Sequence, residues 1–571
     1  MEKGAKQLKV LETVAVTGAV CVLLSMAQMM NHFSAYVWKF HAVSLFDGSF
    51  SWFASMFDRP AALVTYVGRF LTQFCLYPKV AVALLFVIYA VIFALIRRVL
   101  VRDVRFLALA ALVPACLFLS TMTMGYDVVL ARADAQIFSQ PVGVLAALLT
   151  FRLLTVAAKI KGWAGKVLVA LSIAVLYPLL GFYALLGGFT SAIWGLLHSE
   201  GRGRLILPVF SLICVAAIPY IYYLVVFDHT PLRYMWLAGT PYLDFSANKA
   251  PAIWLAAAWA LLPVLALPRF TKKREASWLS LALPLLVYVP LVIAVYRLPD
   301  RRALMHRQFA VEKAMEEGRW DDALSLTATL RVTNDVLVAY RNCALYFKGE
   351  LPQKCWRYSF DTVPLTSGST GFVSSRIAGP QIFYYSGLLN FAARWAFEHN
   401  LYQTYGLERI KILAKVALFN GEKELARKYI GMVGRTTLHK SWARRYMSLL
   451  DNPEELVEDT EYKALAPLQK YDVNKTWYPS DAAAYNVLMF YSFVKGDTSQ
   501  MLEWNIAAAM LTKAPDWFEE LYPQYAAQRA DIPAEVEEAH RIFTNPAFGD
   551  AGAAKGTYSY FYYNENIRRP N

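Results

Sequence analysis

The chain has 571 residues, of which 57% are hydrophobic and 18% are charged; soluble proteins average about 45–50% and about 25%. Residues 1–298 carry 25 Lys and Arg against 11 Asp and Glu, whereas residues 299–571 carry 32 of each sign. The basic charge therefore belongs to the apolar half, which argues against a nucleic-acid-binding protein and a single soluble domain. We expect an all-α protein with a transmembrane bundle in 1–298, a soluble domain in 299–545 and a Tyr- and Gly-rich tail in 546–571.

Nine stretches of the first half are apolar enough to cross a membrane, which takes about 20 residues as a helix. They are 11–30, 80–96, 106–124, 136–157, 167–182, 183–198, 205–227, 251–268 and 277–296. The stretch 167–198 is short for two crossings and long for one. Because basic residues flank both of its ends, we interpret it as a hairpin.

The loops between these segments differ in charge. One set holds 17 basic and five acidic residues, and the opposite set holds eight basic and six acidic. Since basic loops stay in the cytoplasm, this bias places the amino terminus inside and the carboxyl half outside. We therefore expect an inner-membrane protein of a bacterium with a periplasmic carboxyl-terminal domain.

The outer loop 31–79 is rich in aromatic residues and is too polar to span a bilayer. Its pattern favours one or two helices lying in the membrane interface, either as an aromatic belt or as a lid over an outward-facing cavity. Its acids are Asp47 and Asp58, and Arg59 and Arg69 follow them. The run from Asp58 to Pro60 is also typical of a helix start.

Two other outer loops carry charges close to membrane depth, where charges are costly and usually paired. One loop contains Asp127, Arg132 and Asp134, and the other contains Arg233 and Trp236. A structural ion pair of Arg132 with either acid is one explanation. The alternative is a shared cavity for a sugar or a lipid phosphate, in which rings stack, carboxylates take protons and Arg binds phosphate.

The soluble half predicts helices of mixed charge with a recurring turn around Gly318, Gly349, Gly421 and Gly496. The first interval is 31 residues, and the next two fit double periods of 31–38. This spacing is typical of helix–turn–helix repeats of the tetratricopeptide type, so we predict an α-solenoid that presents a surface to a peptide or protein.

Motifs for nucleotides and metals are absent from the sequence, so we expect no cofactor and no metal site. Cys343 and Cys355 either form a disulfide or are two independent buried thiols. The loop Pro364–Gly371 either lines a site or connects two repeats.

Two stretches carry a family resemblance: DRPAALVTYVGRFLTQFCLYP at 58–78 and YPLLGFY at 177–183. They resemble segments of large multi-pass membrane proteins of Bacteroidota-type bacteria that end in a helical-repeat tail. The membrane half is also similar to the polyprenyl-phosphate-sugar-dependent glycosyltransferases (GT-C-like). In that superfamily the catalytic acid lies in the first outer loop just after the first span, whereas here the first acid is Asp47.

This resemblance implies a glycosyltransferase that takes a sugar from a lipid carrier at the outer face. Asp47 or Asp58 would be the catalytic base. The residues Arg59, Arg69, Asp127, Arg132, Asp134, Arg233 and Trp236 would bind the lipid phosphate or the substrate. The alternative is a non-catalytic envelope scaffold whose solenoid recruits a periplasmic partner. A transporter is less favoured, because the spans contain few charges.

Overall fold

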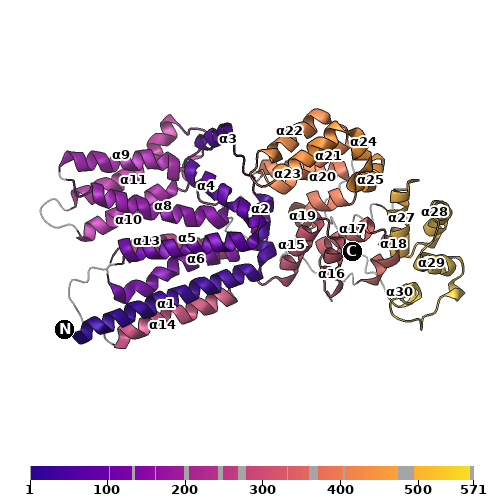
Figure 1. The fold of residues 1–571 in the computed structure, drawn as a ribbon, viewed down its shortest axis with the longest axis horizontal. Coiled ribbons are helices and arrows are strands. Elements are labelled where there is room, and N and C mark those ends of the chain that lie inside the picture. The colour runs from indigo at the N-terminus through magenta and orange to yellow at the C-terminus, as the bar shows by residue number, and fades with distance from the viewer. Residues whose placement is uncertain are drawn as a thin grey trace. The chain divides into compact units, whose positions relative to one another are not determined.

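The computed structural model describes residues 2–101, 103–131, 135–160, 162–198, 205–241, 248–267, 278–330, 332–358, 371–402, 405–472, 491 and 494–565. Over these residues the fold is helical and contains no strand (Figure 1). The chain forms two compact units. The first comprises Met1–Arg301 together with Arg435–Leu438, and the second comprises Arg302–Gly434 and His439–Asn571.

The first unit is a bundle of long helices joined by short ones. The helices are α1 (Glu2–His32), α2 (Ser34–Val43), α3 (Phe50–Ser55), η1 (Met56–Asp58), α4 (Ala62–Thr72), η2 (Gln73–Leu76), α5 (Pro78–Val99), η3 (Val104–Ala111), α6 (Leu112–Met122), α7 (Asp127–Leu130), α8 (Gln136–Ala157), α9 (Trp163–Leu180), α10 (Phe182–His198), α11 (Ile206–Val225), α12 (Leu232–Met235), α13 (Ala250–Leu265) and α14 (Trp278–Arg297).

Each of the nine predicted apolar stretches contains a helix among its described residues. Five helices are long and apolar enough to cross a membrane, and they lie at 9–32, 78–99, 136–157, 163–180 and 206–225. The other four predicted stretches form shorter apolar helices. The stretch 167–198 is divided into α9 and α10, which pack against each other, by Gly181 with a φ of 57°. The chain therefore turns where the hairpin interpretation requires it to turn.

Small residues let the helices of this unit approach closely. A Cβ atom built on Gly143 of α8 would lie 2.3 Å from the ring of Tyr183, at the start of α10. One on Gly187 would lie 2.6 Å from the carbonyl oxygen of Ala147. The Tyr183 hydroxyl also donates a hydrogen bond to Gln140 of α8. Close backbone approach and buried hydrogen bonds are the means by which helices associate in lipid.

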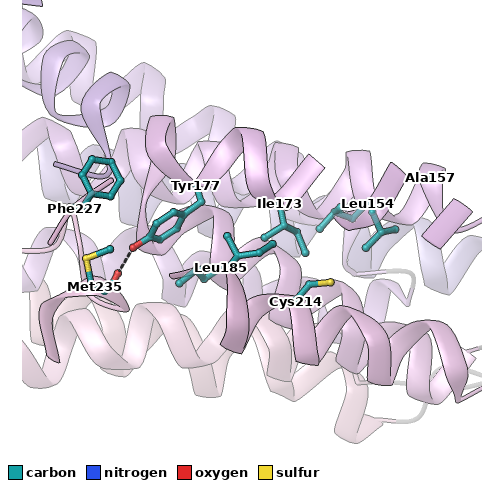
Figure 2. Close-up of a cluster of buried hydrophobic side chains, with 10 residues drawn as sticks. Leu154, Ala157, Ile173, Tyr177, Leu185, Cys214, Phe227 and Met235 are labelled. Carbon is teal, nitrogen blue, oxygen red and sulfur yellow. Dashed lines mark hydrogen bonds between the residues drawn. The ribbon is translucent and has the colours of Figure 1, made fainter. Parts of the chain in front are cut away.

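A cluster of buried side chains joins four helices of this unit (Figure 2). Leu154 comes from α8, Ile173 and Tyr177 from α9, Leu185 from α10, and Cys214 from α11. The Tyr177 hydroxyl donates to the carbonyl oxygen of Met235 at 2.7 Å, so its polar end is satisfied within an apolar cluster (Figure 2). This bond ties α9 to α12, which ends at Met235.

The segment 31–79, for which one or two interfacial helices were predicted, contains one helix packed into the bundle and one exposed on its surface. Helix α2 is buried over Tyr36–Val43, and the Tyr36 hydroxyl donates to the carbonyl oxygen of Thr121 at 2.9 Å. In contrast, α3 has no buried residue. Apolar composition alone does not distinguish a helix packed into the bundle from one that lies on its surface. Only the second of these two helices keeps an exposed aromatic face.

The second unit is a succession of helices. They are α15 (Ala303–Glu316), α16 (Trp320–Ala328), α17 (Asp335–Phe347), α18 (Leu351–Lys354), η4 (Cys355–Arg357), α19 (Gly371–Tyr385), α20 (Leu389–Tyr402), α21 (Leu407–Phe419), α22 (Lys423–Gly434), α23 (Lys440–Asp451), α24 (Pro453–Glu458), α25 (Thr460–Leu465), η5 (Ala466–Tyr471), α27 (Ser499–Thr512), α28 (Pro515–Ala527), α29 (Ala534–Thr544), η6 (Pro546–Phe548) and α30 (Tyr558–Asn564).

Four helices of this unit end in the same way. Gly318, Gly349, Gly387 and Gly421 have φ values between 66° and 82° and follow the last turns of α15, α17, α19 and α21. In each case the glycine N–H bonds three residues back and the next N–H bonds five residues back, as at Glu422 and Ala417 (2.8 Å). This Schellman cap requires a left-handed residue, which glycine adopts without strain. The intervals between the glycines are therefore 31, 38 and 34 residues.

Three further features of the second half can be compared with the predictions: the two cysteines, the tail and the loop that begins at Pro364. Cys343 and Cys355 are free, buried thiols, and burial raises the pKa of Cys355 to about 12. Of the predicted tail, Tyr558 in α30 is buried, and its hydroxyl donates to Met510 at 2.8 Å. Residues 364–370 of the predicted flexible loop lie outside the described residues, and Gly371 begins α19.

Candidate functional site

Three ionisable side chains are buried within one short stretch of the membrane unit. Lys39 and His41 lie in α2, and Asp47 lies four residues after its end. Lys39 has no exposed surface, and His41 and Asp47 expose 4% and 6%. Taking a charge out of water costs several kcal/mol, on the order of 3–5 for an unpaired one. Buried ionisable groups in membrane bundles are therefore usually functional or paired.

Asp47 has a defined set of hydrogen-bond donors. Its Oδ2 accepts from Arg435 Nε at 2.6 Å, and its Oδ1 accepts from the Ser49 main chain at 2.8 Å. The Gly48 N–H donates to the Arg435 carbonyl oxygen at 3.1 Å. Asp47 and Gly48 therefore both bond to Arg435. Burial raises the pKa of Asp47, but the bonds from Arg435 and Ser49 outweigh it and hold the pKa below its usual value. Asp47 is therefore a carboxylate at neutral pH.

Aromatic rings cover the chain next to Asp47. The ring of Phe46 lies 5.3 Å from Trp52, 5.2 Å from Tyr66 and 5.4 Å from Phe70, measured between centroids. The Arg69 guanidinium lies 5.5 Å from the Trp52 ring centroid. The predicted residue Arg69 thus belongs to this aromatic cluster. A cation held over an indole ring is stabilised by about 0.5–1 kcal/mol when exposed.

The second predicted acid has a different environment. Asp58 and Arg59 are exposed. A ring nitrogen of His229 lies 2.9 Å from the main-chain carbonyl oxygen of Asp58, so two of the loops predicted to be outer loops meet at this residue. The Asp58 carboxylate itself takes no part in that contact.

The remaining predicted residues are not gathered around Asp47 by any described contact. Asp127 begins α7, which packs on α2. Arg233 is exposed and lies over the ring of its neighbour Tyr234. Trp236 is partly buried and packs against the apolar cluster drawn in Figure 2. Arg132 and Asp134 lie outside the described residues, and the predicted pair between them stays a prediction.

The described residues contain no group of His, Cys, Asp and Glu that could hold a metal ion. The side chains described in this stretch offer a carboxylate (Asp47), the buried Lys39 and His41, and aromatic rings. Sequence analysis did not single out Lys39 and His41. In the sequence they stand out only as two polar residues within an aromatic stretch. Buried side chains and side chains that extend to water give this same pattern, so the sequence does not distinguish them.

Comparison with known proteins identifies the family. A model of a family of unknown function, DUF6057, matches residues 9–558. The chain belongs to this family. No curated protein and no solved structure matches it. In this DUF6057 chain the match covers both the site around Asp47 and the helices of the second unit, so the two units occur together within one family.

Proposed function

We propose that the first unit crosses the inner membrane about nine times, with its amino terminus in the cytoplasm. The second unit would then be a periplasmic solenoid of the tetratricopeptide type. The relation of α14 to α1 supports this orientation. Tyr296 bonds Gln28 at 2.8 Å, and Tyr288 bonds the carbonyl oxygen of Ala15, so the two helices run in parallel. If both span the bilayer, the chain leaves the bundle on the side opposite to its amino terminus.

The function best supported by the site is transfer of a sugar from a polyprenyl-phosphate carrier at the outer face of the membrane. The observation that supports this proposal is that Lys39, His41 and Asp47, all within nine residues of the first unit, are each buried. A carboxylate serves a transfer reaction as a base, and cations serve as partners of a lipid phosphate. Aromatic rings such as Trp52 and Tyr66 offer stacking faces for a sugar ring.

In this proposal Asp47 is the base, and Asp58, with its exposed carboxylate, is not. The acceptor hydroxyl would give its proton to the Asp47 carboxylate while its oxygen attacks the anomeric carbon. The bond from that carbon to the phosphate oxygen would break, and the lipid phosphate would leave with the bonding electrons. Lys39, His41 and Arg69 would stabilise the phosphate. Since Arg435 occupies Asp47 Oδ2, this ion pair has to open before the proton is accepted.

The test is a mass-spectrometric profile of envelope glycolipids and glycoproteins in a deletion strain. The strain is complemented with wild type, Asp47→Asn, Lys39→Met or Asp58→Asn. We expect wild type and Asp58→Asn to restore one missing sugar, and the other two variants to fail although they are present in the membrane at normal levels. A profile that is identical in the deletion strain and wild type contradicts the transferase proposal.

The second candidate is a non-catalytic scaffold that recruits a periplasmic protein. It is favoured by apolar side chains exposed in the second unit. Phe397 and Leu401 expose 52% and 64% on one face of α20, and the exposed Tyr405 follows them. The test replaces Phe397 and Leu401 by Ser and compares proteins cross-linked to the chain in cells, with Phe548→Ser as control. Loss of one cross-linked protein in the double variant alone supports the scaffold; an unchanged set contradicts it.

A further inference from the structure

Helix α3 and the turn after it carry a row of aromatic side chains whose two ends are exposed. Phe50, Phe53 and Phe57 are three and four residues apart, so they lie on one stripe of the α3–η1 segment. Phe50 exposes 81% of its surface and Phe57 exposes 37%. Phe53 packs edge-on against Tyr66 of α4 with 4.9 Å between ring centroids. The row is therefore fixed on α4 at its middle and open at both ends.

Helix α4 is itself firmly held in the bundle. Val64, Gly68 and Thr72 are buried on one face, and a Cβ on Gly68 would lie 2.7 Å from the Cβ of Ser139 in α8. The opposite face exposes Leu63 and Phe70. The apolar surface of α3 thus continues onto the outer face of a helix that cannot turn to hide it. Contiguous apolar surface of this kind marks contact with a membrane or a partner.

We propose that α3 lies flat in the outer lipid–water interface, with Phe50 and Phe57 inserted between lipids. The occupant is lipid because the same unit contains five helices suited to a bilayer, so lipid surrounds its apolar outer surface. The ends of the segment match the headgroup region: Ser49 precedes the row, and Asp58 and the exposed Arg59 follow it. A helix of six residues is about 9 Å long, too short to cross and suited to lying in the interface.

This inference does not rest on the proposed transferase. Its consequence is positional: anchoring α3 would keep the segment between Asp47 and Asp58 at the membrane surface, because Ser49 caps α3 and its N–H bonds Asp47 at 2.8 Å.

The test uses the full chain in lipid nanodiscs, with the exposed Cys21 replaced by Ser and the other cysteines buried. A fluorophore on Phe50→Cys reports its surroundings through quenching by lipids with a spin label near the headgroup and by iodide in water. The reference is Glu454→Cys, on α24, which has no buried residue. We expect lipid quenching to be at least three-fold stronger at position 50 than at 454, and iodide quenching to be weaker.

Equal lipid quenching at the two positions, or stronger iodide quenching at position 50, would overturn the proposal. Size-exclusion elution of each labelled protein verifies that it is folded. If Phe50→Cys does not fold, Phe57→Cys on the same stripe replaces it, with the same expected result. Quenching that is weak from both sides would indicate a covering protein, and it would also count against a lipid occupant.

Discussion

The main-chain N–H of Ala61 donates to the carbonyl oxygen of Pro178 at 3.0 Å, which joins the segment before α4 to the end of α9. A second main-chain bond, from the Phe182 N–H to the Ala238 carbonyl oxygen at 2.9 Å, joins the start of α10 to the segment after α12. Ala61, Gly181 and Gly239 all have positive φ values, and both glycines lie against Ala61. The two stretches that carry the family resemblance, 58–78 and 177–183, therefore meet at one junction.

Substitutions at this junction should destabilise the membrane unit. A Cβ on Gly181 would lie 2.3 Å from the Ala238 carbonyl oxygen, and one on Gly239 would lie 2.3 Å from the Ala61 Cβ. Each Ala variant adds a clash to the cost of a left-handed residue, which is about 1–2 kcal/mol. Gly162→Ala is the matched control, since Gly162 has a φ of 80° and a Cβ placed on it would meet no atom within 4 Å. Thermal melting in detergent should rank both junction variants below the control, and equal losses would contradict the role of packing.

The Schellman glycines of the second unit allow a similar comparison, in which the backbone strain is alike at two positions and only the packing around the new Cβ differs. Gly387→Ala should cost more than Gly421→Ala, because its Cβ would lie 2.4 Å from Leu468 whereas that of Gly421 would meet no atom. The φ values, 82° and 75°, are nearly equal. We expect Gly421→Ala to cost about 1 kcal/mol and Gly387→Ala to cost about 1–3 kcal/mol more. The rate of limited proteolysis of the full chain compares the stability of the two variants. If Gly421→Ala is cleaved faster than Gly387→Ala, the predicted order is wrong.

Three of the Schellman turns, at Gly318, Gly349 and Gly421, were predicted from the sequence. In each of them a charged residue follows the glycine. Gly387 was not among them because Leu388 follows it, although the cap itself demands only a residue with positive φ. Gly496 fits the sequence signature but does not have a positive φ. A charged residue after a glycine thus indicates that the position is exposed to solvent, whereas the turn itself depends on the backbone conformation of the glycine.

The helices of the bundle were predicted closely because their hydropathy is local; the predicted 136–157 is α8 to the residue. The partner of Asp47 could not be predicted, since Arg435 lies 388 residues away in the sequence. The burial of Lys39 was missed for a related reason. A lysine in an aromatic stretch is compatible with both a snorkelling and a buried side chain, and only the packing of α2 decides between them.

The contact between α8 and α10 predicts a coupled pair of substitutions. Gly143→Ala brings a Cβ to within about 2.5 Å of the Tyr183 ring, which should cost about 1–3 kcal/mol by overpacking. In a Tyr183→Ala background, the ring is absent and the same change should cost under about 0.5 kcal/mol. Melting temperatures of the two single variants and the double variant in detergent give the coupling. Additive losses would show that Gly143 is needed for a reason other than the ring.

Asp472 gives the second unit a pH dependence whose sign is determined by burial. Burial raises the pKa of Asp472 to about 6, against the opposing hydrogen bonds from Asn390 and Phe391. A raised acid pKa favours folding while the group is protonated, so this stabilisation is present below about pH 4 and is lost as the pH rises through 6. Asp472→Asn keeps an acceptor for the Asn390 N–H and removes the titration. The variant should match wild type at pH 4 and exceed it at pH 7.5 by up to about 3 kcal/mol.

The control for this prediction is Asp497, whose pKa is lowered to about 2 by hydrogen bonds from Lys470 and Tyr471. A lowered acid pKa stabilises the fold above the unfolded value and is lost as the pH falls towards 2, so Asp497→Asn should be less stable than wild type at pH 7.5. Melting curves of the full chain at pH 4, 6 and 7.5 should therefore separate the two variants in opposite directions at the highest pH. A difference between Asp472→Asn and wild type that is the same at all three pH values would show that Asp472 does not titrate with a raised pKa, since only a group that is neutral at pH 4 and charged at pH 7.5 makes the difference grow with pH.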